Sequence, residues 1–243
     1  MKWRVFAATL AFAPIAWGAD ETRITPFSGA KPGVELPGGW KPLGLPRAKM
    51  PEFRLLQDGG VTVLQAKGES AAGTVSHPLD ADPREYSLLK WRWKVNRVVG
   101  AADMMTRSNE DFAARVYVFF DVPREALPIG TRAKLRLGAL IYGAELPTAT
   151  ICYVWDNTHP VGTHAPSPFT DTVHTWVLQS GNARANEWTP QARNIEVDFR
   201  AAFGDFWKGP VPRVKGIAVG LDTDQTKESV TATFGDFELG ERP

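Results

Sequence analysis

Three aspartates in the last part of the sequence form a candidate cation site. Asp222 and Asp224 follow an apolar run, residues 214–221, and Asp236 lies on the next predicted strand. If those strands are neighbours, the three carboxylates converge at one end of a sheet, where about six to eight oxygen ligands would suit Ca²⁺. The three aspartates are therefore a candidate structural calcium site. The alternative, which the sequence favours, is that Asp222 and Asp224 form Asx turns that cap their own backbone.

A second group of polar residues surrounds the start of an apolar strand at residues 115–120. A buried guanidinium needs an anionic partner, so we expect Arg115 to pair with Glu110 or Asp111. The alternative places Arg115 and Tyr117 on a ligand-facing surface of the sheet. There the guanidinium would make bidentate hydrogen bonds to an acidic sugar.

A polar loop, residues 155–164, joins two predicted strands and offers further candidate ligand contacts. Tyr153, Asp156, Asn157 and His159 carry groups that hydrogen-bond neutral ligands such as sugars. His159 and His164 could also bind a transition metal. Their spacing matches no standard zinc pattern and no cysteine accompanies them, so the sequence favours a solvated loop.

Tryptophans are numerous, and an exposed indole can stack on the apolar face of a sugar ring. Trp91 and Trp93 alternate with lysine and arginine, which predicts that both lie in the core. Trp188 stands in a polar loop and is the better candidate for a ligand contact.

The sequence assigns no catalytic residue. It contains none of the standard nucleophile, zinc-protease, phosphate-loop or dinucleotide motifs. A glycoside hydrolase or polysaccharide lyase would require side chains that sequence cannot show to meet. The candidates for such a set are Glu110, Asp111, Arg115, Tyr153 and His159.

The N-terminal residues have the three-part order of a cleavable signal peptide. Two cations, Lys2 and Arg4, precede an apolar stretch that ends in small residues, so we expect residues 1–19 to be removed. The stretch is too short to span a membrane, and no span is expected after processing. The mature chain is then periplasmic or secreted, and residues 20–243 are predicted to form one domain.

Charge excludes one class of partner. The full chain has 28 basic and 27 acidic residues, and removing Lys2 and Arg4 leaves 26 against 27. This balance gives no electrostatic footprint for nucleic acid.

Short runs with period-2 alternation, separated by Gly and Pro, predict an all-β fold. Residues 89–95 alternate apolar with cationic side chains, and residues 135–142 are also expected to form a strand. One short helix is predicted at residues 195–203, ended by Gly204 in a left-handed cap. Nine or ten strands with one helix favour a two-sheet antiparallel β-sandwich of the jelly-roll type.

Several ordered blocks resemble an exported bacterial family, domain of unknown function 3047. They are residues 36–40, 89–95, 111–118, 152–157, 216–226 and 234–236. The sequence departs from the family pattern at Asn109-Glu110, where Gly-Asp is expected, and at Leu221, where Thr is expected. The resemblance implies no activity, because the family has no assigned reaction. The chain is also distantly similar to the galactose-binding-type jelly rolls of carbohydrate-binding modules, which often hold a structural Ca²⁺.

Together these features predict an exported, non-catalytic binding domain for a carbohydrate or another component of the cell envelope. The alternatives are an envelope protein that binds a protein partner or has a structural role, and a glycoside hydrolase or polysaccharide lyase on the same scaffold. No cofactor is required in any of them beyond the candidate Ca²⁺.

Overall fold

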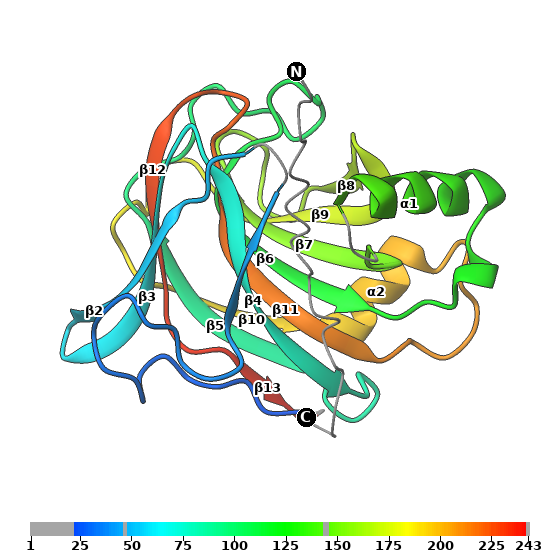
Figure 1. Ribbon diagram of the computed structural model, residues 1–243, viewed down its shortest axis with the longest axis horizontal. Helices are drawn as coiled ribbons and strands as arrows, with labels where there is room; N and C mark the ends of the chain where they lie inside the picture. The colour runs from blue at the N-terminus through cyan, green and yellow to red at the C-terminus, as the bar shows by residue number, and fades with distance from the viewer. Residues whose placement is uncertain (1–21, 46–47, 143–145, 242–243) are drawn as a thin grey trace, which may run out of the picture.

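Two sheets packed face to face form the body of the protein (Figure 1). The computed structural model describes residues 22–45, 48–142 and 146–241. The signal peptide expected at residues 1–19 lies outside the described residues. Within the described part of the chain, no helix has the length and apolar character needed to cross a membrane.

The first sheet has seven strands. Their order is β1 (Lys41–Gly44), β4 (Ala72–Ala81), β11 (Val214–Asp222), β6 (Phe112–Phe120), β7 (Ala149–Asp156), β9 (Thr170–Ser180) and β8 (His164–Ser167). The second sheet has six strands. They are β10 (Thr189–Asn194), β5 (Leu88–Val95), β12 (Ser229–Phe234), β3 (Val61–Glu69), β2 (Glu52–Asp58) and β13 (Glu238–Gly240), the last pairing with β5. This arrangement confirms the β-sandwich. It is not wholly antiparallel, because β7 and β9 run parallel.

Alternation of side chains builds the core between the sheets. On β5, Trp91 and Trp93 are buried, as predicted, while the cationic residues between them face outward. Trp93 meets Trp155 of the facing sheet with 6.1 Å between ring centroids. Large aromatic side chains therefore supply much of the apolar surface that joins the two layers.

Three short strands were not predicted. β1, β8 and β10 contain Pro42, Pro166 and Pro190, respectively, and each lies at the edge of its sheet. Proline lacks a backbone N–H and is tolerated on edge strands, but it interrupts the apolar pattern by which strands are recognised. Proline is therefore typical of edge strands and at the same time makes them difficult to predict from the sequence.

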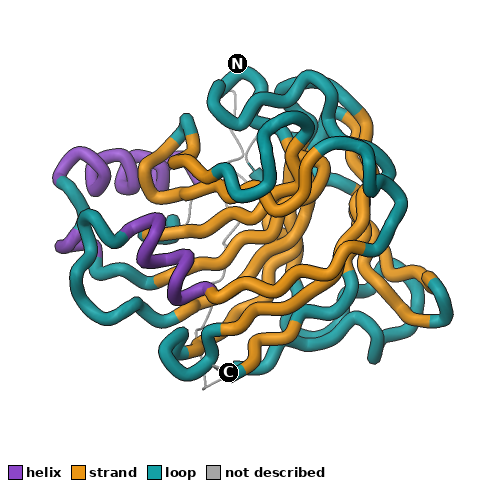
Figure 2. The backbone as a smooth tube through the Cα atoms, turned by 180° about the vertical axis from the view of Figure 1, so that it is seen from behind, coloured by secondary structure: helices purple, strands orange, loops and turns teal. Residues whose placement is uncertain are grey.

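The helices correct the prediction of a single short helix. Residues 135–142 belong to α1 (Ile129–Tyr142) and not to a strand, and a short 3₁₀ turn, η1 (Arg124–Ala126), precedes it. The run contains three leucines, an alanine and an arginine, which favour helix, but its apolar composition was taken as typical of a strand in the sequence-based prediction. Both helices lie at the same end of the sandwich (Figures 1 and 2).

The helix α2 (Ile195–Phe203) confirms the prediction for residues 195–203. The side chain of Asn194 accepts hydrogen bonds from the backbone N–H groups of Glu196 and Val197, each at 3.1 Å, and so caps the first turn. Gly204 is right-handed, with φ −62°, so the predicted left-handed cap was wrong. Glycine is required there by space, because a Cβ would lie 2.3 Å from the carbonyl oxygen of Arg200.

Candidate functional site

A bulge in β6 places both Phe112 and Arg115 on the outer face of the seven-stranded sheet. Gly220 of β11 pairs with Arg115, but Asp222 pairs with Phe112, so β6 holds one extra residue between the two pairs. The extra residue reverses the alternation, and Phe112 and Arg115 both face outward. The guanidinium carbon of Arg115 lies 4.6 Å from the centroid of the Phe112 ring.

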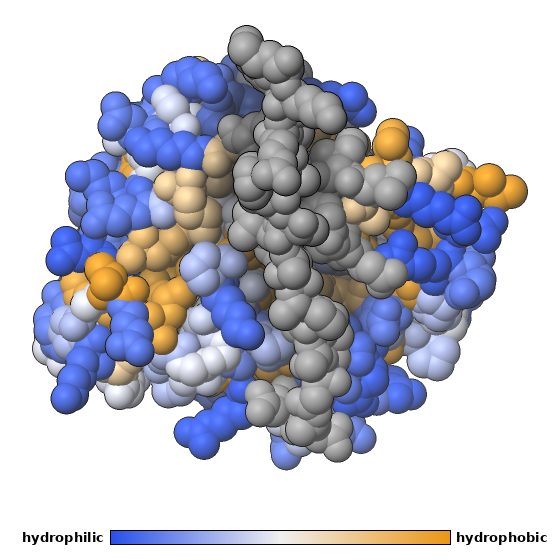
Figure 3. Space-filling view, in the orientation of Figure 1, coloured by the Kyte–Doolittle hydropathy of each residue, from blue (hydrophilic) through white to orange (hydrophobic). Residues whose placement is uncertain are grey.

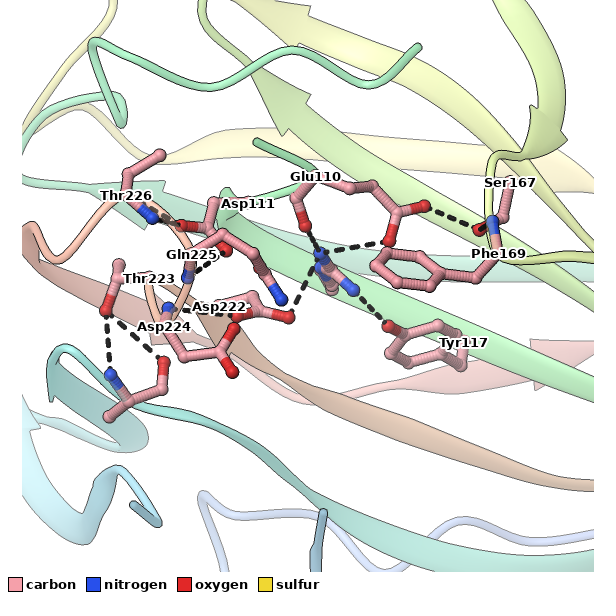
Figure 4. Close-up of polar contacts among 12 residues, drawn as sticks. Glu110, Asp111, Tyr117, Ser167, Phe169, Asp222, Thr223, Asp224, Gln225 and Thr226 are labelled. Carbon is pink, nitrogen blue, oxygen red and sulfur yellow. Dashed lines mark hydrogen bonds and ion pairs between the residues drawn. The ribbon is translucent and has the colours of Figure 1, made fainter. Parts of the chain in front are cut away.

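Arg115 is buried and contacts Glu110, Tyr117 and Asp222, which are labelled in Figure 4. Its guanidinium donates hydrogen bonds to the carbonyl oxygen of Glu110 (2.5 Å) and to the Tyr117 hydroxyl (2.7 Å). Its nearest carboxylate is Asp222, at 3.2 Å, and the Glu110 carboxylate lies at 3.9 Å. The predicted pairing with Glu110 is confirmed, and Asp222 is a partner that the sequence did not indicate.

Three carboxylates come from the residue before β6 (Asp111), the end of β11 (Asp222) and the turn that follows β11 (Asp224). Asp111 is fully buried and accepts hydrogen bonds from the backbone and the hydroxyl of Thr226, both at 2.7 Å. Asp222 accepts from the backbone N–H of Asp224 at 3.3 Å, which is the predicted Asx turn. One oxygen of each carboxylate, from Asp111, Asp222 and Asp224, lies within 4.8 Å of the others.

Burial and neighbouring charges shift the protonation of this cluster. Burial raises the pKa of Asp222 to about 9; the nearby Asp224 and Asp111 carboxyls add to the rise and Arg115 opposes it. Burial alone would lower the pKa of Arg115, but Tyr117, Asp222 and Glu110 hold it above its ordinary value. At neutral pH, Asp222 therefore carries a proton and Arg115 stays charged.

The cluster also contains unmatched polar atoms. Nε of Arg115, Oδ1 of Asp224 and Oε1 of Gln225 are buried without a hydrogen-bond partner among the described residues. Glu110, by contrast, accepts a hydrogen bond from the Ser167 hydroxyl at 2.7 Å, which ties the start of β6 to the end of β8. The polar groups of this cluster are therefore only partly satisfied among the described residues.

The structure brings together two of the three predicted calcium ligands, Asp222 and Asp224, with Asp111 in the place of Asp236. Asp236 is absent from the group; its carboxylate accepts hydrogen bonds from the backbone (2.9 Å) and the hydroxyl (2.5 Å) of Ser28. Arg115 places a positive charge 3.2 Å from Asp222, where it would repel a divalent cation. Binding of Ca²⁺ by Asp222 and Asp224 stays a prediction that calcium titration tests.

Tyr153 faces the other side of its sheet. It is fully buried between the sheets, and its hydroxyl donates to Asp198 of α2 at 2.5 Å. Arg193 of β10 donates to both oxygens of Asp198, at 2.9 and 2.5 Å. The prediction of Tyr153 as a ligand contact was wrong, because β7 is buried on both faces and its sequence does not say which face meets the second sheet.

The polar loop after β7 makes hydrogen bonds within itself and to the loop at residues 100–102. Asp156 accepts hydrogen bonds from the backbone N–H groups of Thr158 (2.8 Å) and His159 (2.7 Å) and lies 3.1 Å from the His159 ring. Asn157 donates to the carbonyl oxygens of Gly100 and Ala102, at 3.1 and 2.8 Å. These three predicted ligand contacts therefore form a turn cap and a loop clasp.

Trp188 lies on the opposite side of the sandwich. Its ring is covered by Arg92 at 4.5 Å and by Lys94 at 4.9 Å, both from the outward face of β5. The predicted set thus divides among the Arg115 cluster, the interior, the loop after β7 and the second sheet. The hydrolase candidates divide in the same way, since Glu110, Asp111 and Arg115 meet while Tyr153 and His159 lie at separate sites.

Next to the Arg115 cluster, an uncharged strip crosses the outer face of the seven-stranded sheet. We call it the outer strip; its residues are Ser76 and Pro78 of β4, Gly216 and Ala218 of β11, and Tyr117 and Phe119 of β6. The rings of Tyr117 and Phe119 are 6.2 Å apart and inclined by only 14°. Cys152 lies beside Tyr117 as an inert thiol, because burial raises its pKa to about 12.

The family of the chain follows from its sequence over most of its length. The family described as "Protein of unknown function (DUF3047)" matches residues 38–238. The chain belongs to this family. No curated protein matches the DUF3047 chain.

Solved structures resemble the DUF3047 protein only distantly. The xyloglucanase domain of NopAA from Sinorhizobium fredii has a TM-score of 0.45 at 9% identity, covering 88% of this chain and 100% of that chain. Endoglucanase cel12A from Rhodothermus marinus has a TM-score of 0.45 at 8% identity, covering 90% and 95%. A family 30 carbohydrate-binding module of a Clostridium thermocellum cellulase has a TM-score of 0.34 at 13% identity, covering 85% and 91%. At these TM-scores the similarities say nothing about what the DUF3047 protein binds.

Sequence reasoning named Tyr117 on a ligand-facing sheet surface of the DUF3047 protein but missed the other residues of the outer strip, although a signal was present. Gly216, Ala218 and Gly220 place a small residue at every second position of β11, so one face of that strand has almost no side chains. The close approach of β4 explains the glycine at 220, where a Cβ would lie 2.2 Å from the carbonyl oxygen of Gly73. The neighbouring residues Tyr117 and Phe119 are partly exposed.

Proposed function

We propose that this protein is an exported, non-catalytic binding protein that holds a carbohydrate of the cell envelope on the outer strip. The observation that carries the proposal is the pair of nearly parallel, partly exposed rings of Tyr117 and Phe119 beside the small residues of β11. Flat aromatic surfaces with nearby hydroxyl groups suit the alternating apolar and polar faces of a sugar chain.

Arg115 orients this surface. Its hydrogen bond to the Tyr117 hydroxyl, two residues further along β6, makes the ring lie along the sheet rather than stand away from it. Arg115 is itself fixed by Glu110 and Asp222. The buried cluster thus acts as a support for the aromatic residue, and Arg115 is a positioning residue in this proposal.

The charge of the outer strip favours a neutral ligand. Its six residues are uncharged, and the guanidinium nearest to it is buried and engaged by carboxylates. Ser76 adds a partly exposed hydroxyl one strand away from Ala218. A neutral polysaccharide therefore fits better than the acidic sugar considered from the sequence.

Affinity gel electrophoresis of the mature protein against a panel of polysaccharides tests the proposal. We expect at least one neutral polysaccharide to retard the protein. Tyr117→Ala and Phe119→Ala should each weaken retention about tenfold, which corresponds to 1.4 kcal/mol. Tyr117→Phe keeps the aromatic ring, so it should reduce retention by the polysaccharide less than Tyr117→Ala does.

Trp188→Ala is the matched control, because it removes a partly exposed aromatic residue from the other sheet. It should leave retention unchanged. Loss of retention in Trp188→Ala alone would move the site to the six-stranded sheet. No retention on any polysaccharide, with the circular dichroism of a folded β protein, would reject carbohydrate binding.

A second candidate function rests on α1. Ile129 and Leu137 are 78% and 61% exposed, and with Ala133 they follow a four-residue spacing that places them on one face of the helix. Figure 3 shows hydrophobic residues at the right of the molecule, where Figure 1 places α1. This stripe favours an envelope protein as a partner. Leu137→Lys should then reduce cross-linking to that partner in cells without changing retention by polysaccharide.

A further inference from the structure

Two histidines meet at the free edge of the seven-stranded sheet. His164 begins β8 and His174 lies on β9, at diagonal positions of the ladder that joins these strands. Nδ1 of His164 and Nε2 of His174 are 3.1 Å apart. We propose that this pair binds a divalent late transition-metal ion, Cu²⁺ or Zn²⁺, with water in the remaining coordination positions.

The separation of the two nitrogens suits a shared metal ion. Imidazole nitrogens bind zinc at about 2.0–2.1 Å, so two of them on a tetrahedral ion lie about 3.3 Å apart. The observed separation of 3.1 Å needs only a small outward movement of one ring. Imidazole ligands select Cu²⁺, Zn²⁺ and Ni²⁺ over the hard cations Ca²⁺ and Mg²⁺.

The hydrogen bonds of His174 leave its Nε2 available as a metal ligand. Its ring also hydrogen-bonds to the backbone of Ala202 in the last turn of α2. Because Nε2 faces His164, this bond is left to Nδ1, which carries the proton when it donates to a carbonyl oxygen. Nε2 of His174 then has a free lone pair, as in metal sites where a ligating histidine donates its other N–H to the backbone.

Packing holds both rings in place. His164 stacks on Trp176, with 4.2 Å between centroids and 23° between planes. The ring of His174 meets Phe203 of α2 edge to face at 6.0 Å. Bringing two such rings together therefore costs little further side-chain entropy when a metal binds. In the free protein a proton of His164 bridges the nitrogens, and the ion would replace that proton.

His159 provides a matched control for the two ligands. It lies 3.1 Å from Asp156, which caps the turn after β7, and it faces a carboxylate where His164 faces a second imidazole. Its other ring nitrogen lies 3.9 Å from a carboxylate oxygen of Asp103, so His159 has carboxylate neighbours on both sides and no second imidazole among its contacts with the described residues. Comparing variants of His164 and His174 with a variant of His159 therefore distinguishes binding by the histidine pair from nonspecific binding of metal to surface histidines.

Titration of the full mature protein at pH 7.5 tests the inference, with Cu²⁺ followed by tryptophan fluorescence and Zn²⁺ followed by calorimetry. We expect saturable binding, with affinity at least about tenfold weaker in His164→Gln and in His174→Gln. His159→Gln should bind as the wild type does. Trp176→Phe should keep the Zn²⁺ affinity but lose most of the quenching by Cu²⁺.

Three outcomes would overturn the site: no saturable binding, unchanged affinity in both ligand variants, or full quenching that persists in Trp176→Phe. His164 is exposed at the start of an edge strand, so its variant is expected to fold, which circular dichroism checks. The site is independent of the outer strip. Failure of metal binding would leave retention by polysaccharide unaffected, and the reverse also holds.

Discussion

Two arginine clusters of similar composition differ in how completely their polar groups are matched. Arg193 makes two hydrogen bonds to Asp198, which also accepts from Tyr153, and all three residues join α2 to the two sheets. Arg115 contacts Asp222, Glu110 and Tyr117, but its Nε and the nearby Asp224 Oδ1 lack partners among the described residues. In the first cluster Tyr153 and Asp198 are buried, the Arg193 side chain is 28% exposed, and the hydrogen bonds are complete. The second is incompletely matched and supports an aromatic residue of the outer face.

The difference shows how a cluster that only stabilises the fold can be distinguished from one that positions a residue of the ligand surface. Both contain an arginine, an aspartate and a tyrosine, so residue types alone do not separate them. Satisfaction of the buried polar groups and the direction in which the tyrosine ring points do separate them. We therefore expect the Arg193 cluster to act on stability, and the Arg115 cluster to act on proton uptake and binding.

The largest expected effect is a pH dependence from Asp222. Its pKa in the folded protein, about 9, is above its value in the unfolded chain, so the folded state binds the extra proton between these values. This contribution to stability is complete below about pH 4 and is lost as the pH rises toward 9. The free energy of unfolding should fall by up to about 1.4 kcal/mol per pH unit, or about 4 kcal/mol from pH 5 to 8.

Urea denaturation across this range, compared between the wild type and Asp222→Asn, measures the effect. The amide cannot ionise, so the variant should show a much flatter profile than the wild type. Parallel profiles for the two proteins would mean that Asp222 is ionised in the folded state, and the assigned protonation would be wrong.

The next effect concerns the Arg193 cluster. Asp198→Ala leaves Arg193 and Tyr153 without their shared acceptor, and we expect it to lower the free energy of unfolding by about 3 kcal/mol. Glu187→Ala is the control, since it breaks a pair with Arg184 in which both side chains are about half exposed. Exposed pairs contribute about 0–1 kcal/mol. Equal losses in the two variants would show that the Arg193 cluster stabilises the fold no more than an exposed ion pair does.

A smaller loss is expected on removing the cation of the incompletely matched cluster. Arg115→Met should cost about 1–2 kcal/mol at pH 7, because Asp222 is already neutral there and chiefly the hydrogen bonds are lost. Denaturation at pH 7 measures this loss, and retention by polysaccharide should also weaken because Tyr117 loses its support. A loss as large as that in Asp198→Ala would show that Arg115 neutralises an ionised Asp222.

Calcium is expected to have the smallest effect. With Arg115 in place, the melting temperature should be the same in Ca²⁺ and in chelator to within about 1 °C, a shift well below 1 kcal/mol for a domain of this size. In Arg115→Met, the carboxylates lose the neighbouring charge and Ca²⁺ should raise the melting temperature. A rise in the wild type would instead support the calcium site predicted from the sequence.

The sequence predicted the parts of the fold that depend on local pattern. The alternation around Trp91 and Trp93 gave the correct buried face, and the cap at Asn194 begins the predicted helix. Edge strands with proline were missed, and residues 135–142 were assigned to a strand because a short apolar run fits both periods.

The site was harder to predict because it depends on pairing between distant segments. Arg115 and Glu110 are near in sequence and were recognised, whereas Asp222 reaches Arg115 only through the neighbouring strand β11 and a bulge in β6. A bulge leaves no mark in the apolar pattern when the extra residue is alanine. For the same reason Asp236 was grouped with Asp222 along the chain, although it contacts Ser28.

The most direct test uses the four tyrosines of the chain as reporters, Tyr86, Tyr117, Tyr142 and Tyr153. Ring signals of tyrosine-labelled mature protein, assigned with single Tyr→Phe variants, can be followed by NMR while the retained polysaccharide is added as an oligosaccharide. A saturable shift of the Tyr117 ring signals, with those of Tyr153 unchanged, is the predicted result. Binding that moves the signals of Tyr153 and leaves Tyr117 unaffected would contradict the assignment of the outer strip as the ligand surface.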